Sequence, residues 1–182
     1  LNIPVVTTFN GMALIEEDNN HFVGRIGTVG QRAGNFVLQN ADLILELGTR
    51  NNIRQVSYNW KNFGKKAYKI VVDIDKAELE KPLVKPDLAI NTNLKDFIPE
   101  LLSKSHSKLI SKSYIKNWIE YCREIKEKYS FEKEDYYKQK SNDLINPYYF
   151  TRKISENLRE NDIFVMGNGS RCVCPFQVAK VG

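Results

Sequence analysis

The chain has 182 residues, of which 42% are hydrophobic, so it can form one large domain, or one domain and part of another. Its net charge is +5, but between Lys104 and Lys140 acidic residues interleave with the basic ones, which argues against a nucleic-acid-binding surface. No apolar run approaches the roughly 20 residues of a membrane span, and three cysteines form no disulfide framework, so we expect a cytoplasmic protein that does not enter a membrane.

The first half of the chain alternates between predicted strands and helices. In chain order we predict a strand at 1–8, a helix at 31–40, a strand at 41–48, a helix at 55–63, a strand at 69–75 and a helix at 93–103. The second and third strands are rich in Ile, Val and Leu and do not alternate with polar residues, which is typical of strands buried on both faces of a parallel sheet. The pattern predicts an α/β fold with a Rossmann-like, doubly wound parallel sheet.

The second half of the chain has a different pattern of apolar and charged residues. Residues 104–144 form a predicted connector with one amphipathic helix, because apolar residues between Tyr114 and Tyr129 recur at helical spacing. A new unit is predicted at 145–182, with a helix that begins at Asn146-Pro147, a buried strand at 163–167 and a second helix from 171 to 181. The sequence therefore predicts a first domain at 1–103 and the first elements of another after residue 144.

Polar residues follow two of the predicted strands directly. Gly48 and Arg50 come after the strand at 41–48, and Asp73 and Asp75 lie at the end of the strand at 69–75. Ligands bind parallel sheets at the carboxyl edge, so this edge is the predicted site of a nucleotide-like ligand. The alternative for the aspartates is structural, with Asp75 as the N-cap of a helix that begins at KAEL.

Glycines gather in the segment GRIGTVGQRAG between Gly24 and Gly34. The spacing of Gly27 and Gly30 departs from the G-x-G-x-x-G fingerprint, so two interpretations stay open. The glycines either permit a tight loop and close packing of a helix on a strand, or they present backbone amides to a phosphate at a helix N-terminus.

Four segments together resemble the thiamine-diphosphate-dependent enzymes of the acetolactate synthase type. They are IPVVTTFNGM, GRIGTVGQRAGNFVLQNADLILELGTR, KIVVDIDKAEL and NPYYFTRKISENLRENDIFVMGNGS. The resemblance implies a parent with three α/β domains. This chain would supply most of the central domain, without its first βα unit, and the beginning of the C-terminal diphosphate-binding domain.

The resemblance also implies a reaction. Such enzymes decarboxylate a 2-keto acid and pass the bound carbanion to a second carbonyl or release an aldehyde, as transferases or lyases, and they form homodimers or homotetramers. Their thiamine diphosphate is activated by a glutamate and held by Mg²⁺ through a GDG…N motif. These 182 residues contain neither, so we predict no catalytic residue and no metal ligand here and expect the segment alone to be inactive.

Two groups of cofactor-binding residues follow from the resemblance. The loop Asn168, Gly169 and Ser170 would reach the diphosphate. The structural alternative is that Ser170 is a helix N-cap. The positions where acetolactate synthases hold FAD fall on Thr8, Phe9, Ile26–Gly30, Gly48–Arg50, Arg54, Asp73 and Ile74. Because the acidic residues expected near Asn51-Asn52 and Thr92-Asn93 are missing, FAD, ADP or no ligand stay open for this second group.

Two other hypotheses remain. One is a nucleotide-binding module without thiamine chemistry that uses the surface from Gly27 to Asp73. The other is a purely structural α/β module.

Overall fold

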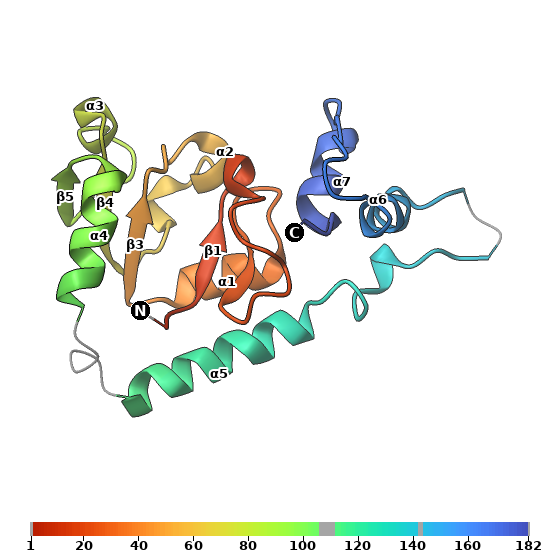
Figure 1. Cartoon of the computed structure of the whole chain (residues 1–182), viewed down its shortest axis with the longest axis horizontal. Coiled ribbons are helices and arrows are strands. Elements are labelled where there is room, and N and C mark those ends of the chain that lie inside the picture. Colours follow the sequence, from red (N-terminus) through yellow and green to blue (C-terminus); the bar gives the residue numbers. More distant parts are fainter. Residues whose placement is uncertain (1, 106–111, 142–143, 182) are drawn as a thin grey trace.

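The structure is a computed structural model that describes residues 2–105, 112–141 and 144–181 (Figure 1). Its described strands form two parallel sheets. The first contains β1 (Val5–Thr7) and β2 (Phe22–Arg25), and the second contains β3 (Leu43–Leu47), β4 (Tyr68–Asp73) and β5 (Leu88–Asn91) in that order. The predicted α/β class with parallel pairing is confirmed.

The helices surround these sheets and continue beyond them. Their bounds are α1 (Arg32–Asn40), α2 (Ile53–Val56), α3 (Lys76–Leu79), α4 (Leu94–Lys104), α5 (Lys112–Lys128), α6 (Pro147–Glu156) and α7 (Ser170–Val178), with 3₁₀ turns η1 (Phe9–Gly11), η2 (Trp60–Asn62) and η3 (Asp135–Tyr137). Short polar side chains begin four of the helices by accepting a hydrogen bond from a first-turn amide: Asn52, Asp75, Asn93 and Asn146. The helices predicted at 31–40 and 93–103, and the one in the connector, are confirmed as α1, α4 and α5.

The core has two parts. One lies under α2 and contains Ile26, Leu38, Val56, Phe63 and Val84. The other joins α1 and β2 to α5 and contains Val23, Ala33, Val37 and Cys122. The amphipathic α5 thus packs its apolar face on the first sheet unit, as Figure 1 shows for its course below α1. None of the helices in the described ranges has the length and apolarity that crossing a bilayer requires.

Two local predictions are wrong, and two strands were missed. The segment 163–167 is not a strand, because no described segment pairs with it, and Ile163 and Val165 are 87% and 83% exposed. The helix predicted at 55–63 is instead the short α2 and η2, since Ser57 adopts a φ of 64° and ends α2. The sequence analysis did not predict strands β2 and β5. Gly24 lies within β2, and a glycine in this position is typical of a turn.

Candidate functional site

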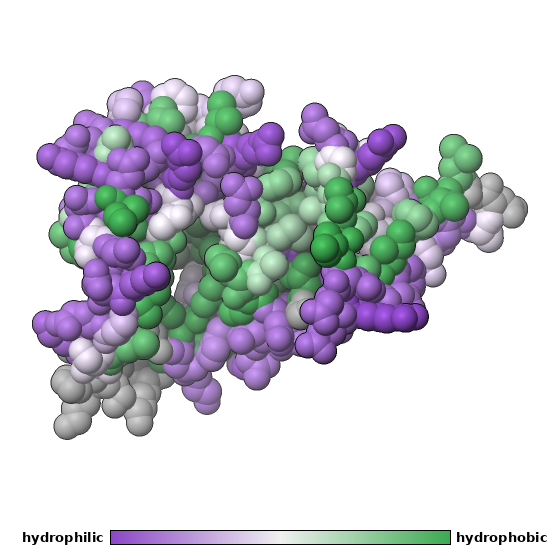
Figure 2. Space-filling view, turned by 45° about the horizontal axis from the view of Figure 1, so that its top comes forward, coloured by the Kyte–Doolittle hydropathy of each residue, from purple (hydrophilic) through white to green (hydrophobic). Residues whose placement is uncertain are grey.

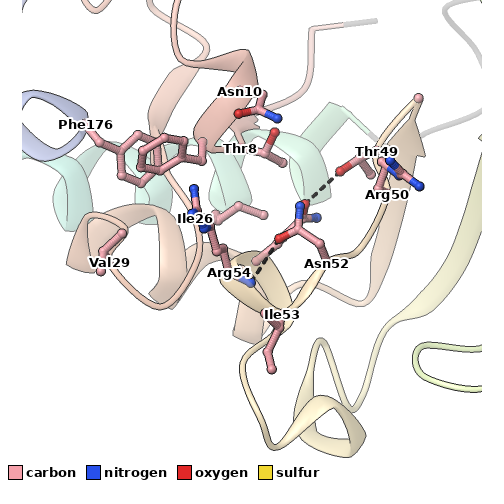
Figure 3. Close-up of a pocket in the computed structure, with 13 residues that line it drawn as sticks. Thr8, Asn10, Ile26, Val29, Thr49, Arg50, Asn52, Ile53, Arg54 and Phe176 are labelled. Carbon is pink, nitrogen blue, oxygen red and sulfur yellow. Dashed lines mark hydrogen bonds between the residues drawn. The ribbon is translucent and has the colours of Figure 1, made fainter. Parts of the chain in front are cut away.

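A pocket of about 320 Å³ lies at the carboxyl ends of β1, β2 and β3 (Figure 3). Of the two strand ends predicted to hold a ligand, the end of β3 contributes to it and the end of β4 does not. The segments after these three strands, the start of α2 and one side chain of α7 contribute to it. The lining residues are Thr8, Phe9, Asn10, Ile26, Val29, Gly48, Thr49, Arg50, Asn52, Ile53, Arg54, Gln55 and Phe176.

The turn between β3 and α2 is fixed by its own side chains. Gly48 adopts a φ of +59°, and its amide continues the ladder to the carbonyl of Val72 at 2.9 Å. The Asn52 carboxamide oxygen accepts from the amide of Arg54 at 2.9 Å, and the Thr49 hydroxyl donates to Gln55 at 2.8 Å (Figure 3). The pocket wall is therefore held in place before any ligand binds.

Two arginines give the pocket its positive charge. The Arg54 guanidinium lies 5.5 Å from the centre of the Phe9 ring. Arg50 instead donates two hydrogen bonds to Glu78, at 3.0 and 2.7 Å. Hydrogen bonds from Lys81 and Arg50 hold the pKa of Glu78 below its usual value. Arg50 is thus already engaged by a carboxylate, whereas Arg54 offers its charge to the pocket.

The structure brings together some of the residues predicted for a nucleotide site and leaves others aside. Thr8, Phe9, Gly48, Arg50 and Arg54 line the pocket, as do Ile26 and Val29 of the predicted stretch 26–30. The residues left aside are Gly27, Gly30, Asp73 and Ile74.

The aspartates serve local structure. Asp73 is buried and accepts a hydrogen bond from the amide of Asp75 at 2.9 Å. Asp75 in turn accepts from the amide of Ala77 at 2.9 Å and is the N-cap of α3, so the structural alternative for Asp75 is confirmed. Ile74, between them, is 67% exposed.

The glycine segment uses its amides within the protein. The amide of Gly27 donates to the Asn35 side chain, and that of Gly30 donates to the Gly27 carbonyl, both at 3.0 Å. A Cβ atom at Gly30 would lie 2.6 Å from the carbonyl oxygen of Arg25, and one at Gly27 would lie 2.6 Å from that of Arg54. Of the two interpretations, the geometry therefore favours close packing over phosphate binding by these two amides.

The second predicted group lies on an exposed loop before α7. Asn168 accepts from the amide of Gly169 at 2.8 Å, and Gly169 is the N-cap with a φ of 66°. Ser170 is the first residue of the helix, so the alternative that it is the N-cap is wrong. The first turn carries no acidic residue and includes Arg171. The loop therefore presents the positive end of a nine-residue helix to solvent, an arrangement that suits an anionic group.

Comparisons with known proteins identify the family of the chain. The family model described as "Thiamine pyrophosphate enzyme, central domain" matches residues 1–101. The chain belongs to the thiamine pyrophosphate enzyme family. It is 35% identical over 129 residues to the acetolactate synthase large subunit of Lactococcus lactis, covering 71% of this chain and 21% of the relative. It is 34% identical over 131 residues to that of Cyanidium caldarium, covering 71% and 22%.

A third relative covers more of the chain. The probable acetolactate synthase large subunit of Methanocaldococcus jannaschii is 30% identical over 162 residues, covering 89% of this chain and 26% of the relative. The chain thus spans between 21% and 26% of the length of these three relatives.

Hydrogen bonds join α7 to residues in and beside the glycine segment. Arg25 is fully buried and donates to the carbonyls of Phe176 at 2.9 Å and Ala179 at 2.8 Å. Gln31 donates to the carbonyl of Gln177 at 2.7 Å, and the Gln177 side chain donates back to Val29 at 2.9 Å. Residues of the glycine segment thus form the surface to which α7 is hydrogen-bonded.

A second arginine holds the same end of α7. Arg152 of α6 donates to the carbonyl of Val178 at 3.1 Å and to both carboxylate oxygens of Glu17, at 2.9 and 2.7 Å. Three carbonyls at the C-terminal end of α7 therefore accept from guanidinium groups, which complements the negative end of the helix dipole.

Phe176 was missed by the sequence analysis and belongs to the pocket. The centre of its ring lies 4.6 Å from that of Phe9, so α7 forms one wall of the pocket (Figure 3). No sequence signal marks this contact, because it joins residues more than 160 positions apart.

The described cysteines and acids do not form a metal site. Within the described ranges no group of three or more His, Cys, Asp or Glu side chains could hold a metal ion. Burial raises the pKa of the Cys122 thiol to about 12, so it is protonated and inert at neutral pH.

Proposed function

We propose that this chain is part of a thiamine-diphosphate-dependent enzyme that acts on 2-keto acids by decarboxylation, carboligation or both. The observation that carries the proposal is the match of residues 1–101 to the central domain of this family. The relatives named acetolactate synthase support the keto-acid substrate class.

The loop before α7 would hold the diphosphate end of the cofactor. Gly169 leaves open space where a Cβ would stand, and Asn168 and Ser170 are exposed beside the helix N-terminus. Asn168 accepts from the Gly169 amide with its oxygen, which leaves its Nδ2 group as a donor. These donors suit phosphate oxygens. When bound, thiamine diphosphate supplies the carbanion that attacks the keto carbon.

The remaining parts of the active site lie elsewhere. We propose that Mg²⁺ accompanies the diphosphate and that its ligands, with the activating glutamate, lie outside the residues described here, which contain no suitable acidic cluster. We therefore expect the segment alone to be inactive. The complete enzyme is proposed to be a cytoplasmic homodimer or homotetramer.

The pocket beside Arg54 is proposed to hold the diphosphate and ribose of a nucleotide. Its volume of about 320 Å³ lies at the lower end of the range of ~300–1,000 Å³ for small-molecule pockets, which favours ADP over the larger FAD. The absence of a bound flavin absorption band from the purified full-length protein would agree with this choice, and a stoichiometric flavin would contradict it.

The experiment that tests the main proposal is an activity assay of the full-length protein. With thiamine diphosphate, Mg²⁺ and pyruvate, we expect release of CO₂ together with acetolactate or acetaldehyde. Omission of thiamine diphosphate should abolish both. If CO₂ release from pyruvate and from a panel of longer 2-keto acids stays at the cofactor-free level, the proposal is wrong.

A further inference from the structure

A chain of hydrogen bonds joins the pocket to a buried carboxylate. The Thr49 hydroxyl donates to Gln55 at 2.8 Å, and the Gln55 amide group donates to Asn51 at 2.9 Å. Asn51 in turn donates to the carboxylate of Glu46. Thr49 and Gln55 line the pocket, whereas Asn51 and Glu46 lie outside its lining. We call these side chains the Glu46 network.

The inner end of the Glu46 network is an unusual place for a charge. Hydrophilic residues cover much of the outer surface in the left part of the view in Figure 2, and most carboxylates are found at such surfaces. Glu46, by contrast, is 5% exposed, and every other residue of β3 is Leu or Ile. Asn51 is 7% exposed and has a φ of 48°, a left-handed conformation that asparagine tolerates well. Both side chains are therefore fixed in the interior beside the pocket.

The carboxylate determines the direction of every hydrogen bond in the network. An ionised carboxylate can only accept, so Asn51 must direct its NH₂ group to Glu46 and its oxygen to Gln55. Gln55 then donates with its own NH₂ group, and its oxygen is left for Thr49. Thr49 is consequently the donor in its bond with Gln55.

This direction decides what Thr49 offers to a ligand. A threonine hydroxyl has one hydrogen and two lone pairs, and the hydrogen of Thr49 is already used by Gln55. Only lone pairs remain for the pocket, so Thr49 is an acceptor there. A phosphate oxygen is also an acceptor and is unsuited to this position, whereas a hydroxyl group of a sugar can donate to it.

The positive charge of the pocket lies at a different position. The Arg54 guanidinium lies over the ring of Phe9, which contacts Phe176. In the view of Figure 3, this guanidinium is on the side of Phe176, and Thr49 is on the opposite side. Guanidinium groups bind phosphate oxygens well. The pocket thus has one position for an anion and another for a hydroxyl donor.

We propose that a nucleotide binds in this pocket with its diphosphate at Arg54 and a ribose hydroxyl donating to Thr49, and that Glu46 is the positioning residue that sets this orientation through Asn51 and Gln55. The inference rests on the proposed nucleotide pocket and adds the orientation of the ligand. Without the buried carboxylate, both amides could turn, and the Thr49 hydroxyl could donate to a phosphate oxygen instead.

A comparison of two nucleotides tests the orientation in the full-length natural protein. The probes are ADP and 2′,3′-dideoxy-ADP, which lacks both ribose hydroxyls, and calorimetric titration measures their affinities. Because the dideoxy compound leaves Thr49 without its donor, we expect it to bind about tenfold more weakly than ADP. Equal affinities would overturn the orientation.

Thr49→Val tests whether Thr49 receives the hydroxyl. Valine has nearly the shape of threonine but no hydroxyl, so we expect this variant to bind both nucleotides with similar affinity. If it keeps the tenfold preference for ADP, the ribose hydroxyls bind elsewhere and the orientation is wrong.

Glu46→Leu tests the positioning role. We expect the preference for ADP over the dideoxy compound to fall clearly below that of the natural protein. A smaller fraction of folded protein lowers the signals of both nucleotides alike, so the ratio of affinities separates positioning from stability. Glu160→Leu, at an exposed glutamate, is the control and should keep the full preference. An unchanged preference in Glu46→Leu would show that Glu46 does not set the direction of the network.

The same titrations separate this inference from the proposed pocket. Binding of ADP without any preference for the ribose hydroxyls would refute the orientation alone. If the full-length natural protein does not bind ADP at all, the nucleotide assignment of the pocket is wrong, and the orientation is refuted with it.

Discussion

Arg54 and Arg50 both line the pocket, but their surroundings differ. Arg50 is held by Glu78 at 2.7 Å, whereas Arg54 lies over the Phe9 ring. Since charge-assisted hydrogen bonds contribute about 1.5–3 kcal/mol, Arg54→Gln should weaken ADP binding at least tenfold. Arg50→Gln serves as the matched control and should weaken it less. Calorimetric titration of the full-length protein with ADP measures both, and a larger effect of Arg50→Gln would contradict the assignment.

Glu46 makes stability depend on pH. Its side chain is buried, accepts from Asn51 and leaves Oε1 without a partner, and burial raises its pKa above 4.5. The folded state therefore binds this proton more tightly than the unfolded state, so Glu46 costs stability as pH rises through its raised pKa.

The substitution Glu46→Gln should remove this dependence. We expect the variant to gain stability relative to the natural protein at pH 7 and to show no such gain at pH 4. Urea unfolding at both pH values provides the measurement. A difference between the two proteins that does not change with pH would contradict a raised pKa for Glu46.

Asn168 and Ser170 carry the proposed contact with the diphosphate. Because hydrogen bonds to a charged group contribute about 1.5–3 kcal/mol, Asn168→Ala with Ser170→Ala should weaken thiamine diphosphate binding at least tenfold. Ser141→Ala, at another exposed serine, is the control and should leave the affinity unchanged. Unchanged affinity in the double variant would remove this loop from the cofactor site.

Among the elements, α7 connects the two proposed sites. The loop 168–170 lies at its N-terminal end, its side chain Phe176 lines the pocket, and its C-terminal carbonyls accept hydrogen bonds from Arg25 and Arg152. The buried guanidinium groups thus fix where the proposed cofactor loop stands relative to the first sheet.

Replacement of Arg25 should release α7. Arg25→Met removes two charge-assisted hydrogen bonds, so we expect hydrogen exchange at residues 170–178 to accelerate and thiamine diphosphate to bind more weakly. Arg159→Met, at an exposed arginine of the region after α6, is the control. Fast exchange confined to other elements would contradict a docking role for Arg25.

Sequence patterns predicted elements whose cause is local. The apolar runs of β3 and β4 and the caps of α3 and α6 depend on adjacent residues. The end of β3 placed Gly48 and Arg50 in the pocket, whereas Thr8 and Arg54 followed from the resemblance. Sequence patterns gave the wrong result, or none, where contacts between distant residues determine the structure. Segment 163–167 has strand composition without a described partner, and the contacts of Arg25 with α7 join residues about 150 positions apart.

For the whole molecule, the family and the fold point to one account. The α/β part that matches the family leads through α5 to α6 and α7, and α7 is hydrogen-bonded to Arg25 of β2 (Figure 1). The structural alternative would need no ligand at either the pocket or the loop. The enzyme account needs thiamine diphosphate at the loop.

The most direct test is a calorimetric titration of the full-length protein with thiamine diphosphate in the presence of Mg²⁺. We predict saturable binding of one cofactor per chain that a magnesium chelator abolishes. Failure of the folded protein to bind thiamine diphosphate at any Mg²⁺ concentration would contradict the account.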